Sequence, residues 1–412
     1  MLRYTGHPLV DVGAATIVAY VGKTNVEAVT EADLEEIVKL ISREYVRDPL
    51  KSFLNVAFPN SGFTQPAFEK KPERRREYAN RVLRESRMGQ SSELETCPFT
   101  GKPATAISFS DSLPPGRAFR QHVPLLTGEG VINFHPWGDV GLPISGEAML
   151  CIQAFPLGCA KIGGRLLAVH SDNPDLICEF ASRFVKANLS ALMLAQQEGS
   201  KKMPEAPASA RTLLIRTLLE VEAERRNESA DRRPSSVSAY HLTNSGQSNA
   251  LDPRNPPLAI YHLPLELTDF LASMVSPEYS LAWHVIEERG WQLATPKGKV
   301  AAAEDQGKTP RRTNVLYEDL FGLPENAPFF VRRYFLRFPL RTHSDADPRH
   351  SYSLRKEADL VSWKLTELFV RKVMGMNKDR ADLIRKLGDQ LAEYVSSEND
   401  KRFFASFFEH RY

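Results

Sequence analysis

Two cysteines, each with a glycine close behind, open the most unusual parts of this sequence. Cys97 begins the run CPFTGKPA, and Cys159 begins CAKIGGRLL. Structural zinc sites use four Cys or His ligands, but Thr100 and Ile162 stand where the second cysteine of each Cys-x-x-Cys pair belongs. His122, His135 or His170 could complete a site, but the spacing gives no evidence for any of them. We therefore interpret Cys97 and Cys159 as remnants of a degenerate zinc-knuckle region (97–170), and we expect no metal and no cofactor. A structural zinc is the alternative.

The segment between these cysteines has the richest mixture of guanidinium, amide and aromatic groups in the chain. The run GRAFRQHVPLL is followed by NFHPWGD. Arginine and amide side chains can hydrogen-bond to base edges in a DNA groove. The candidate base-contacting residues here are Arg117, Arg120, Gln121, His122 and Asn133. The alternative is an arginine–carboxylate network that holds a loop-rich core together.

An earlier loop, PNSGFTQPAF, offers a second candidate surface for reading bases. It contains small, flexible residues, two amide side chains and a phenylalanine that could stack on a base. The candidates are Asn60, Ser61, Gly62, Phe63, Thr64 and Gln65. The alternative is a turn whose phenylalanine side chains belong to the core.

A strongly basic stretch follows this loop. Residues 69–89 carry eight Lys or Arg against four Glu, and a proline start predicts a helix over 72–88. Lysine and arginine bind phosphates by charge, largely without reading sequence. The candidates for DNA-backbone contact are Lys70, Lys71, Arg74, Arg75, Arg76, Arg81 and Arg84. The alternative is a solvated helix balanced by its own glutamates.

Catalytic patterns are weak. A cluster in RTHSDADPRH, made of His343, Asp345, Asp347 and His350, could hold a metal for a nuclease, but the same stretch reads as a polar loop. No Ser-His-Asp pattern or phosphate-binding glycine loop is present. We expect no enzymatic activity.

The sequence pattern predicts that helices and strands of an α+β fold position these residues. Apolar periodicity predicts helices over 32–46, 174–197 and 211–226 and a helical stripe over 383–394. The runs LKSFLNVAF, SAYHL and LAIYHL read as strands, and AMLCIQAF and RLLAVHS read as strands or a buried helical turn. We expect an irregular, loop-rich N-terminal body (1–350) and a helical C-terminal region (351–412).

The composition is that of an ordinary soluble protein. The 412 residues carry a net charge of +2, with 42% hydrophobic and 25% charged residues. Four cysteines without a secretory pattern, no signal peptide and no long apolar run favour a cytoplasmic protein with no membrane partner.

Seven blocks of the sequence are long and specific: DVGAATIVAYVGK, FPNSGFTQPAF, CPFTGKPA, GRAFRQHVPLLTGEGVINF, GLPISGEA, FPLGCAKIGGRLLAVHSD and NVLYEDLFGLPENAPFFVRRYFL. Together they resemble the large subunit of the type I-B CRISPR Cascade, in the branch named for its CXXC-CXXC region. The similarity runs from about residue 7 to about residue 375. The single surviving cysteine of each pair departs from the family pattern and puts its zinc site in doubt.

The resemblance implies a non-catalytic, RNA-guided DNA-binding subunit of a prokaryotic antiviral ribonucleoprotein complex. Such a subunit recognises the protospacer-adjacent motif (PAM) in double-stranded target DNA and helps to form the R-loop. Its implied partners are the crRNA-bound backbone and 5′-handle subunits, the small subunit, and a recruited helicase-nuclease or transposition machinery. The region after Arg355 is short for a four-helix bundle, so other helices contribute to the small-subunit role or a separate chain supplies it.

Overall fold

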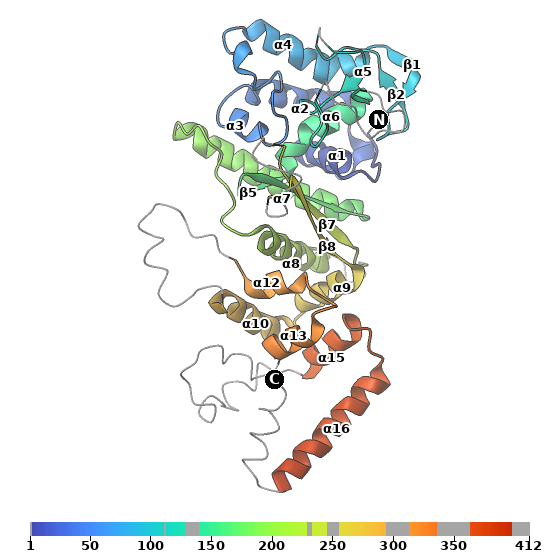
Figure 1. Ribbon diagram of the computed structural model, residues 1–412, viewed down its shortest axis with the longest axis vertical. Coiled ribbons are helices and arrows are strands. Elements are labelled where there is room, and N and C mark those ends of the chain that lie inside the picture. Colours follow the sequence, from blue (N-terminus) through green and yellow to red (C-terminus); the bar gives the residue numbers. More distant parts are fainter. Residues whose placement is uncertain are drawn as a thin grey trace.

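The chain forms an elongated body with an N-terminal helical unit at one end, a sheet in the middle and a second helical unit at the other end (Figure 1). The computed structural model describes residues 2–110, 113–128, 140–228, 233–244, 255–293, 313–335 and 363–397. Helices dominate and the strands form small antiparallel sheets, so the α+β prediction is confirmed. Among the described residues, no helix is both long enough and apolar enough to cross a membrane.

The N-terminal unit is organised around α1 (Pro8–Val21), which is buried on nearly every face. Its close packing depends on Gly13, where an added Cβ would lie 1.9 Å from the carbonyl oxygen of Cys151 in α6 (Gly146–Ala154). The helix ends at Gly22, which adopts the left-handed conformation (φ 68°) that glycine tolerates best.

Helix α2 (Glu31–Glu44) begins at the predicted capping box. The Thr30 N–H donates to Asp33 Oδ2 at 2.8 Å, and the Asp33 N–H donates to Thr30 Oγ1 at 3.3 Å. These bonds satisfy two amides that a helix start leaves unpaired.

The remaining elements of this unit are short, as the many Pro and Gly residues predict. They are α3 (Leu50–Leu54), α4 (Pro72–Asn80), a π-turn (Arg81–Glu85), α5 (Ser86–Met88), β1 (Ser91–Thr96), β2 (Pro103–Thr105), β3 (Arg117–Ala118) and β4 (Leu142–Pro143). The predicted basic helix is thus confirmed, with a π-turn before its last residues.

The strand predicted for LKSFLNVAF is wrong, because this run forms α3 and the turns that follow it. Phe53 and Leu54 of α3 and Phe58 of the following turn are all buried in the N-terminal core. A short apolar run has no periodicity strong enough to separate a buried strand from a buried helical turn.

The central sheet contains β5 (Ala160–Ile162), β6 (Arg165–Ser171), β7 (Val237–Leu242) and β8 (Leu258–Leu263), antiparallel and in that order. The predicted strands around RLLAVHS, SAYHL and LAIYHL are confirmed. Because side chains alternate along a strand, β6 faces two cores: Leu166 and Ala168 belong to the N-terminal core, whereas Leu167 and Val169 belong to the second. The sheet therefore joins the two halves of the body.

Helices complete the second core. They are α7 (Pro174–Gln197), α8 (Ala210–Glu228), α9 (Leu265–Met274), α10 (Ser280–Leu293), α12 (Val315–Leu320), α13 (Ala327–Phe330) and α15 (Trp363–Lys372), with a π-turn at Val331–Phe335. Leu365 and Phe369 of α15 are buried in this core. The domain boundary that we predicted at residue 350 lies outside the described residues. The last described helix, α16 (Lys378–Ser397), projects from the body (Figure 1).

Candidate nucleic-acid interface

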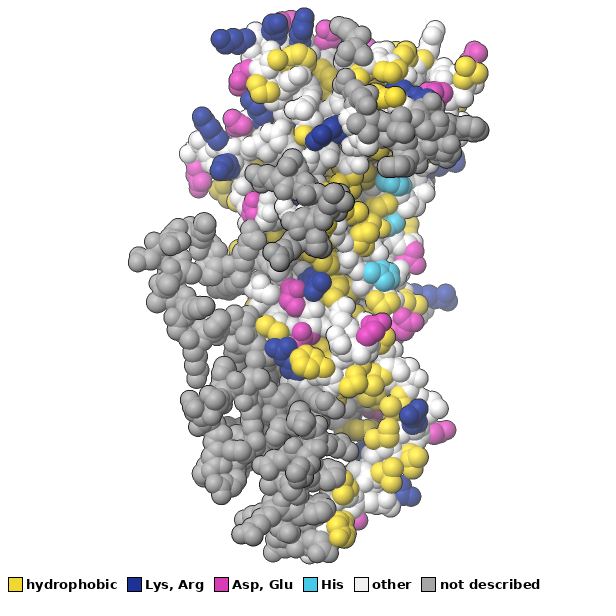
Figure 2. All heavy atoms as spheres, in the orientation of Figure 1, with side chains coloured by type: hydrophobic (Ala, Val, Ile, Leu, Met, Phe, Trp, Pro, Cys, Tyr) yellow, Lys and Arg dark blue, Asp and Glu magenta, His cyan; other side chains and the backbone are white. Residues whose placement is uncertain are grey.

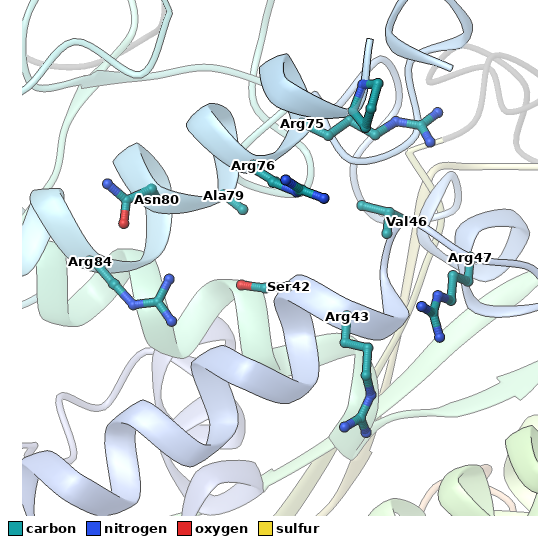
Figure 3. A pocket seen from close by; sticks show the side chains of 10 residues that line it. Ser42, Arg43, Val46, Arg47, Arg75, Arg76, Ala79, Asn80 and Arg84 are labelled. Carbon is teal, nitrogen blue, oxygen red and sulfur yellow. The ribbon is translucent and has the colours of Figure 1, made fainter. Parts of the chain in front are cut away.

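Five arginines line a cleft of about 590 Å³ between the end of α2 and the basic helix α4. From α2 and the turn after it come Arg43 and Arg47, and from α4 and its π-turn come Arg75, Arg76 and Arg84. Val46 and Ala79 supply apolar surface between them (Figure 3). The lining contains no acidic side chain. The cleft therefore concentrates positive charge beside a small apolar surface.

Two of these arginines are held by carboxylates. Arg84 Nε lies 3.0 Å from Glu35 Oε2 and 3.1 Å from Oε1, and this hydrogen bonding lowers the pKa of Glu35. Arg43 Nε lies 2.5 Å from Glu44 Oε1. Each carboxylate offsets part of the charge of its arginine, and such exposed pairs contribute only about 0–1 kcal/mol to stability.

The other three arginines keep donors for a ligand. Within the described residues, the exposed side chains of Arg47 and Arg76 make no ion pair. Arg75 is half-buried, and its Nε and Nη2 are shielded from solvent without a hydrogen-bond partner. A buried donor without a partner costs about 1–3 kcal/mol, so the Arg75 guanidinium is not satisfied where it lies.

The cationic surface continues along the N-terminal end of α4. Lys70, Lys71 and Arg74 are exposed, and Figure 2 shows Lys and Arg side chains at this end of the molecule. Arg81 instead pairs with Glu77, with 2.5 Å between Nη2 and Oε1. Of the predicted backbone-contacting residues, five keep accessible charge or unpartnered donors, whereas Arg81 and Arg84 are paired.

The loop before α4 is mostly buried, which corrects part of the prediction. Ser61, Gly62, Phe63 and Thr64 have little or no exposed surface. The Phe63 ring makes edge-to-face contacts with two tyrosines, Tyr45 at 5.6 Å and Tyr78 at 5.1 Å between ring centroids. In this structure the ring is a core residue and presents no face to a base.

The amides at the two ends of this loop remain accessible. Asn60 is exposed and adopts a left-handed backbone (φ 62°), and Gln65 is half-exposed. An added Cβ at Gly62 would meet the Tyr78 ring at 2.4 Å. Because Tyr78 lies in α4, the loop is packed directly onto the helix that lines the arginine cleft.

The 116–122 segment is also more structural than we predicted. Arg117 pairs with Glu95 of β1 and reaches the Gly141 carbonyl oxygen at 3.4 Å. Arg120 donates to the carbonyl oxygen of Asn244 at 3.4 Å. These contacts fit the arginine-network alternative.

His122 is fully buried, and Gln121 is half-buried. Burial lowers the pKa of His122 to about 3, so the imidazole is neutral at pH 7. Its Nδ1 accepts the Phe119 N–H at 3.2 Å, and its ring packs against Tyr78 and Phe109. His122 therefore has no surface for a DNA contact. Asn133 lies outside the described residues.

Both remnant cysteines are buried thiols. Cys159 Sγ donates to the Phe155 carbonyl oxygen at 3.1 Å, and burial holds its pKa well above the usual value. The backbone forms a turn after Cys97, in which the Gly101 N–H donates to the Cys97 carbonyl oxygen at 2.9 Å. His170 pairs with Asp11 at 3.1 Å. Over the described ranges, no three His, Cys, Asp or Glu side chains are grouped as a metal site would require. The residues 343–350 and His135 lie outside these ranges.

Sequence reasoning missed Arg43 and Arg47. They lie four residues apart, a spacing typical of two side chains on one side of a helix, although only Arg43 lies in α2 and Arg47 lies in the turn after it. That spacing was the available signal.

No family model, curated protein or solved structure matches this chain.

Proposed function

We propose that this chain is the non-catalytic large subunit of a CRISPR Cascade-type complex, and that its arginine cleft holds the phosphate backbone of target DNA. The observation that carries the proposal is the cleft itself: it has no acidic lining residue, and its exposed Arg47 and Arg76 make no ion pair within the described residues. Phosphate groups are the ligands that such a surface favours. The sequence resemblance is the reason to place this DNA-binding surface in an RNA-guided complex.

Within this proposal, the exposed ends of the 60–65 loop recognise the PAM. Guide pairing reads most of the target in RNA-guided complexes, so the protein needs only a short readout surface and backbone charge. Asn60 and Gln65 carry amides with both a donor and an acceptor, as adenine edges require. They stand on a loop that Tyr78 fixes to α4, beside the cationic surface.

Salt-dependent binding of the assembled complex to target DNA tests the cleft. The slope of log affinity against log salt should flatten by about 0.9 for every phosphate that the protein no longer neutralises. The double variant Arg47→Ala/Arg76→Ala should therefore weaken binding at low salt and lower the slope by up to about 1.8. The matched control is Arg226→Ala, which removes an exposed arginine at the end of α8. An unchanged slope in the double variant, with the complex intact, would refute the cleft assignment.

A separate measurement tests the absence of catalysis. We expect the purified chain to leave DNA intact in Mg²⁺ or Mn²⁺. Cleavage that His343→Ala or Asp345→Ala abolishes would instead establish the metal-dependent nuclease. If the cleft variants left DNA binding untouched and chelators weakened assembly, a zinc-stapled, protein-binding scaffold would be the better account.

A further inference from the structure

The strand β8 forms an open edge of the central sheet (Figure 1). It pairs with β7 on one side, and among the described residues no strand pairs with its other side. The opposite edge of the sheet is different. There β5 is only three residues long, and its Lys161 carbonyl oxygen accepts the Ala206 N–H at 2.9 Å. The sheet is therefore open to a further strand at β8.

The register of β8 on β7 determines which main-chain groups point away from the sheet. The Thr243 N–H donates to the Pro257 carbonyl oxygen at 2.9 Å, and the register continues without a break along both strands. Because hydrogen-bonded positions alternate along an antiparallel pair, every second residue after Pro257 bonds to β7. The residues between them, whose N–H and C=O groups point outward, are Leu258, Ile260 and His262. Within the described ranges, none of these main-chain groups has a hydrogen-bond partner.

This edge lacks the features that usually protect an edge strand from pairing. Natural edge strands are very short or carry a charge, a proline or a bulge. The strand β8 reads LAIYHL, six residues without Lys, Arg, Asp, Glu, Pro or Gly, and Ile260 at its centre is 56% exposed. Prolines follow and precede it at positions 264 and 256–257, where main-chain N–H groups are missing. The open edge thus has the length of one short strand.

We propose that the β8 edge is a docking site for an extended strand of a neighbouring protein subunit. This docking rests on the proposed function, because that function provides neighbouring subunits. The edge offers main-chain donors and acceptors at strand spacing, and an added strand satisfies them in register. An apolar side chain of that strand would lie beside Ile260, on the face where Leu258 packs against the N-terminal core.

A second copy of this chain fits the same edge less well. An antiparallel two-fold pair that uses all of β8 is centred on Ile260. It sets each Leu258 beside a His262, an apolar side chain against an exposed imidazole. A parallel pair has no two-fold axis of this kind and leaves an open edge for the next copy.

Hydrogen exchange resolved to single residues, in the free chain and in the assembled complex, tests the docking. In the free chain the outward amides of Leu258, Ile260 and His262 should exchange fast, while the alternate amides that bond to β7 exchange slowly. Assembly should slow the three outward amides by about tenfold or more.

Proline substitution separates main-chain pairing from side-chain contact. Ile260→Pro removes an outward N–H and breaks no bond to β7, so its melting temperature should stay close to that of the wild type. It should weaken assembly by about tenfold or more, because the added strand loses a bond and meets the proline ring. The matched control Ile260→Thr keeps the main chain and the β-branched shape, so it should assemble almost normally. Assembly is measured as the mass of the complex, separately from DNA binding.

Four results would overturn the docking. Outward amides that still exchange fast in the assembled complex exclude it and leave the proposed function intact. Slow exchange in the free chain shows that another part of this chain covers the edge, or a second copy if the mass doubles with concentration. Equal loss of assembly in Ile260→Thr and Ile260→Pro indicates a side-chain contact. A chain that never joins the complex refutes the proposed function, and the docking with it.

Discussion

Replacing Phe63 with alanine separates a core role for this ring from a base-stacking role. The ring has no exposed surface and contacts Tyr45 and Tyr78 edge to face. Phenylalanine-to-alanine changes in cores cost about 3–5 kcal/mol. Two aromatic pairs, each worth about 0.5–1.5 kcal/mol beyond burial, account for roughly 1–3 kcal/mol of that. Because domains are stable by only about 5–15 kcal/mol, the variant should lose a large part of its unfolding free energy.

Urea unfolding followed by far-ultraviolet circular dichroism measures this loss. Phe63→Leu keeps apolar volume but removes both ring contacts, so it should lose about 1–3 kcal/mol. Phe68→Ala is the matched control, because Phe68 is only half-buried in the same segment and its removal should cost less. From most to least stable, the expected order is the wild type, Phe68→Ala, Phe63→Leu and Phe63→Ala.

DNA binding by the assembled complex decides between the two roles. If Phe63 belongs to the core, Phe63→Leu should bind target DNA normally wherever the chain is folded. The core reasoning fails if Phe63→Ala unfolds within about 1 kcal/mol of the wild type while DNA binding is abolished. That pair of results would mean that the ring leaves the core to stack on a base, an interaction worth about 1–3 kcal/mol.

Three further predictions use other contacts. The pKa of His122 is lowered from 6.5 to about 3, so below pH 6.5 the unfolded chain binds more protons. The free energy of unfolding should then fall by about 1.4 kcal/mol per pH unit below pH 6.5, or about 2 kcal/mol at pH 5. Urea unfolding at pH 7, 6 and 5 should show a shallower fall with decreasing pH for His122→Gln than for the wild type. Glu35→Gln releases the Arg84 guanidinium, so it should strengthen DNA binding and steepen its salt slope, while unfolding changes by less than about 1 kcal/mol; weaker binding would contradict this. Gly13→Ala forces a methyl group against the Cys151 carbonyl and should cost about 1–3 kcal/mol or more in thermal unfolding; an unchanged melting temperature would count against the helix packing described above.

Local signals predicted much of the fold. The capping box at Thr30 and Asp33 and the apolar face after it place α2 to within a residue or two of its observed bounds. The α16 stripe was equally readable, because a 3.6-residue period stays visible even where nothing covers the helix. Short buried runs such as 50–58 lack such a period, and only their surroundings decide between a strand and a helical turn.

Only part of the candidate site could be predicted from the sequence. Composition alone indicated the basic helix α4, but the cleft also contains Arg43 from α2 and Arg47 from the turn after it. The 116–122 residues failed for the opposite reason. Arg117 meets Glu95, 22 residues earlier, and His122 is covered by rings from distant segments. The sequence near residues 116–122 does not indicate these partners.

Tyr78 joins the two halves of the proposed DNA surface. Its ring touches Phe63 and stacks on His122, and its hydroxyl lies 3.3 Å from Ser61 Oγ. The same residue lies in α4, which also carries the cleft residues Arg75 and Arg76. Side chains buried in this way move together, because a packed core does not deform continuously. The 60–65 loop is therefore held next to the arginines that we propose bind phosphate, as reading a short motif at a set position on the backbone would require.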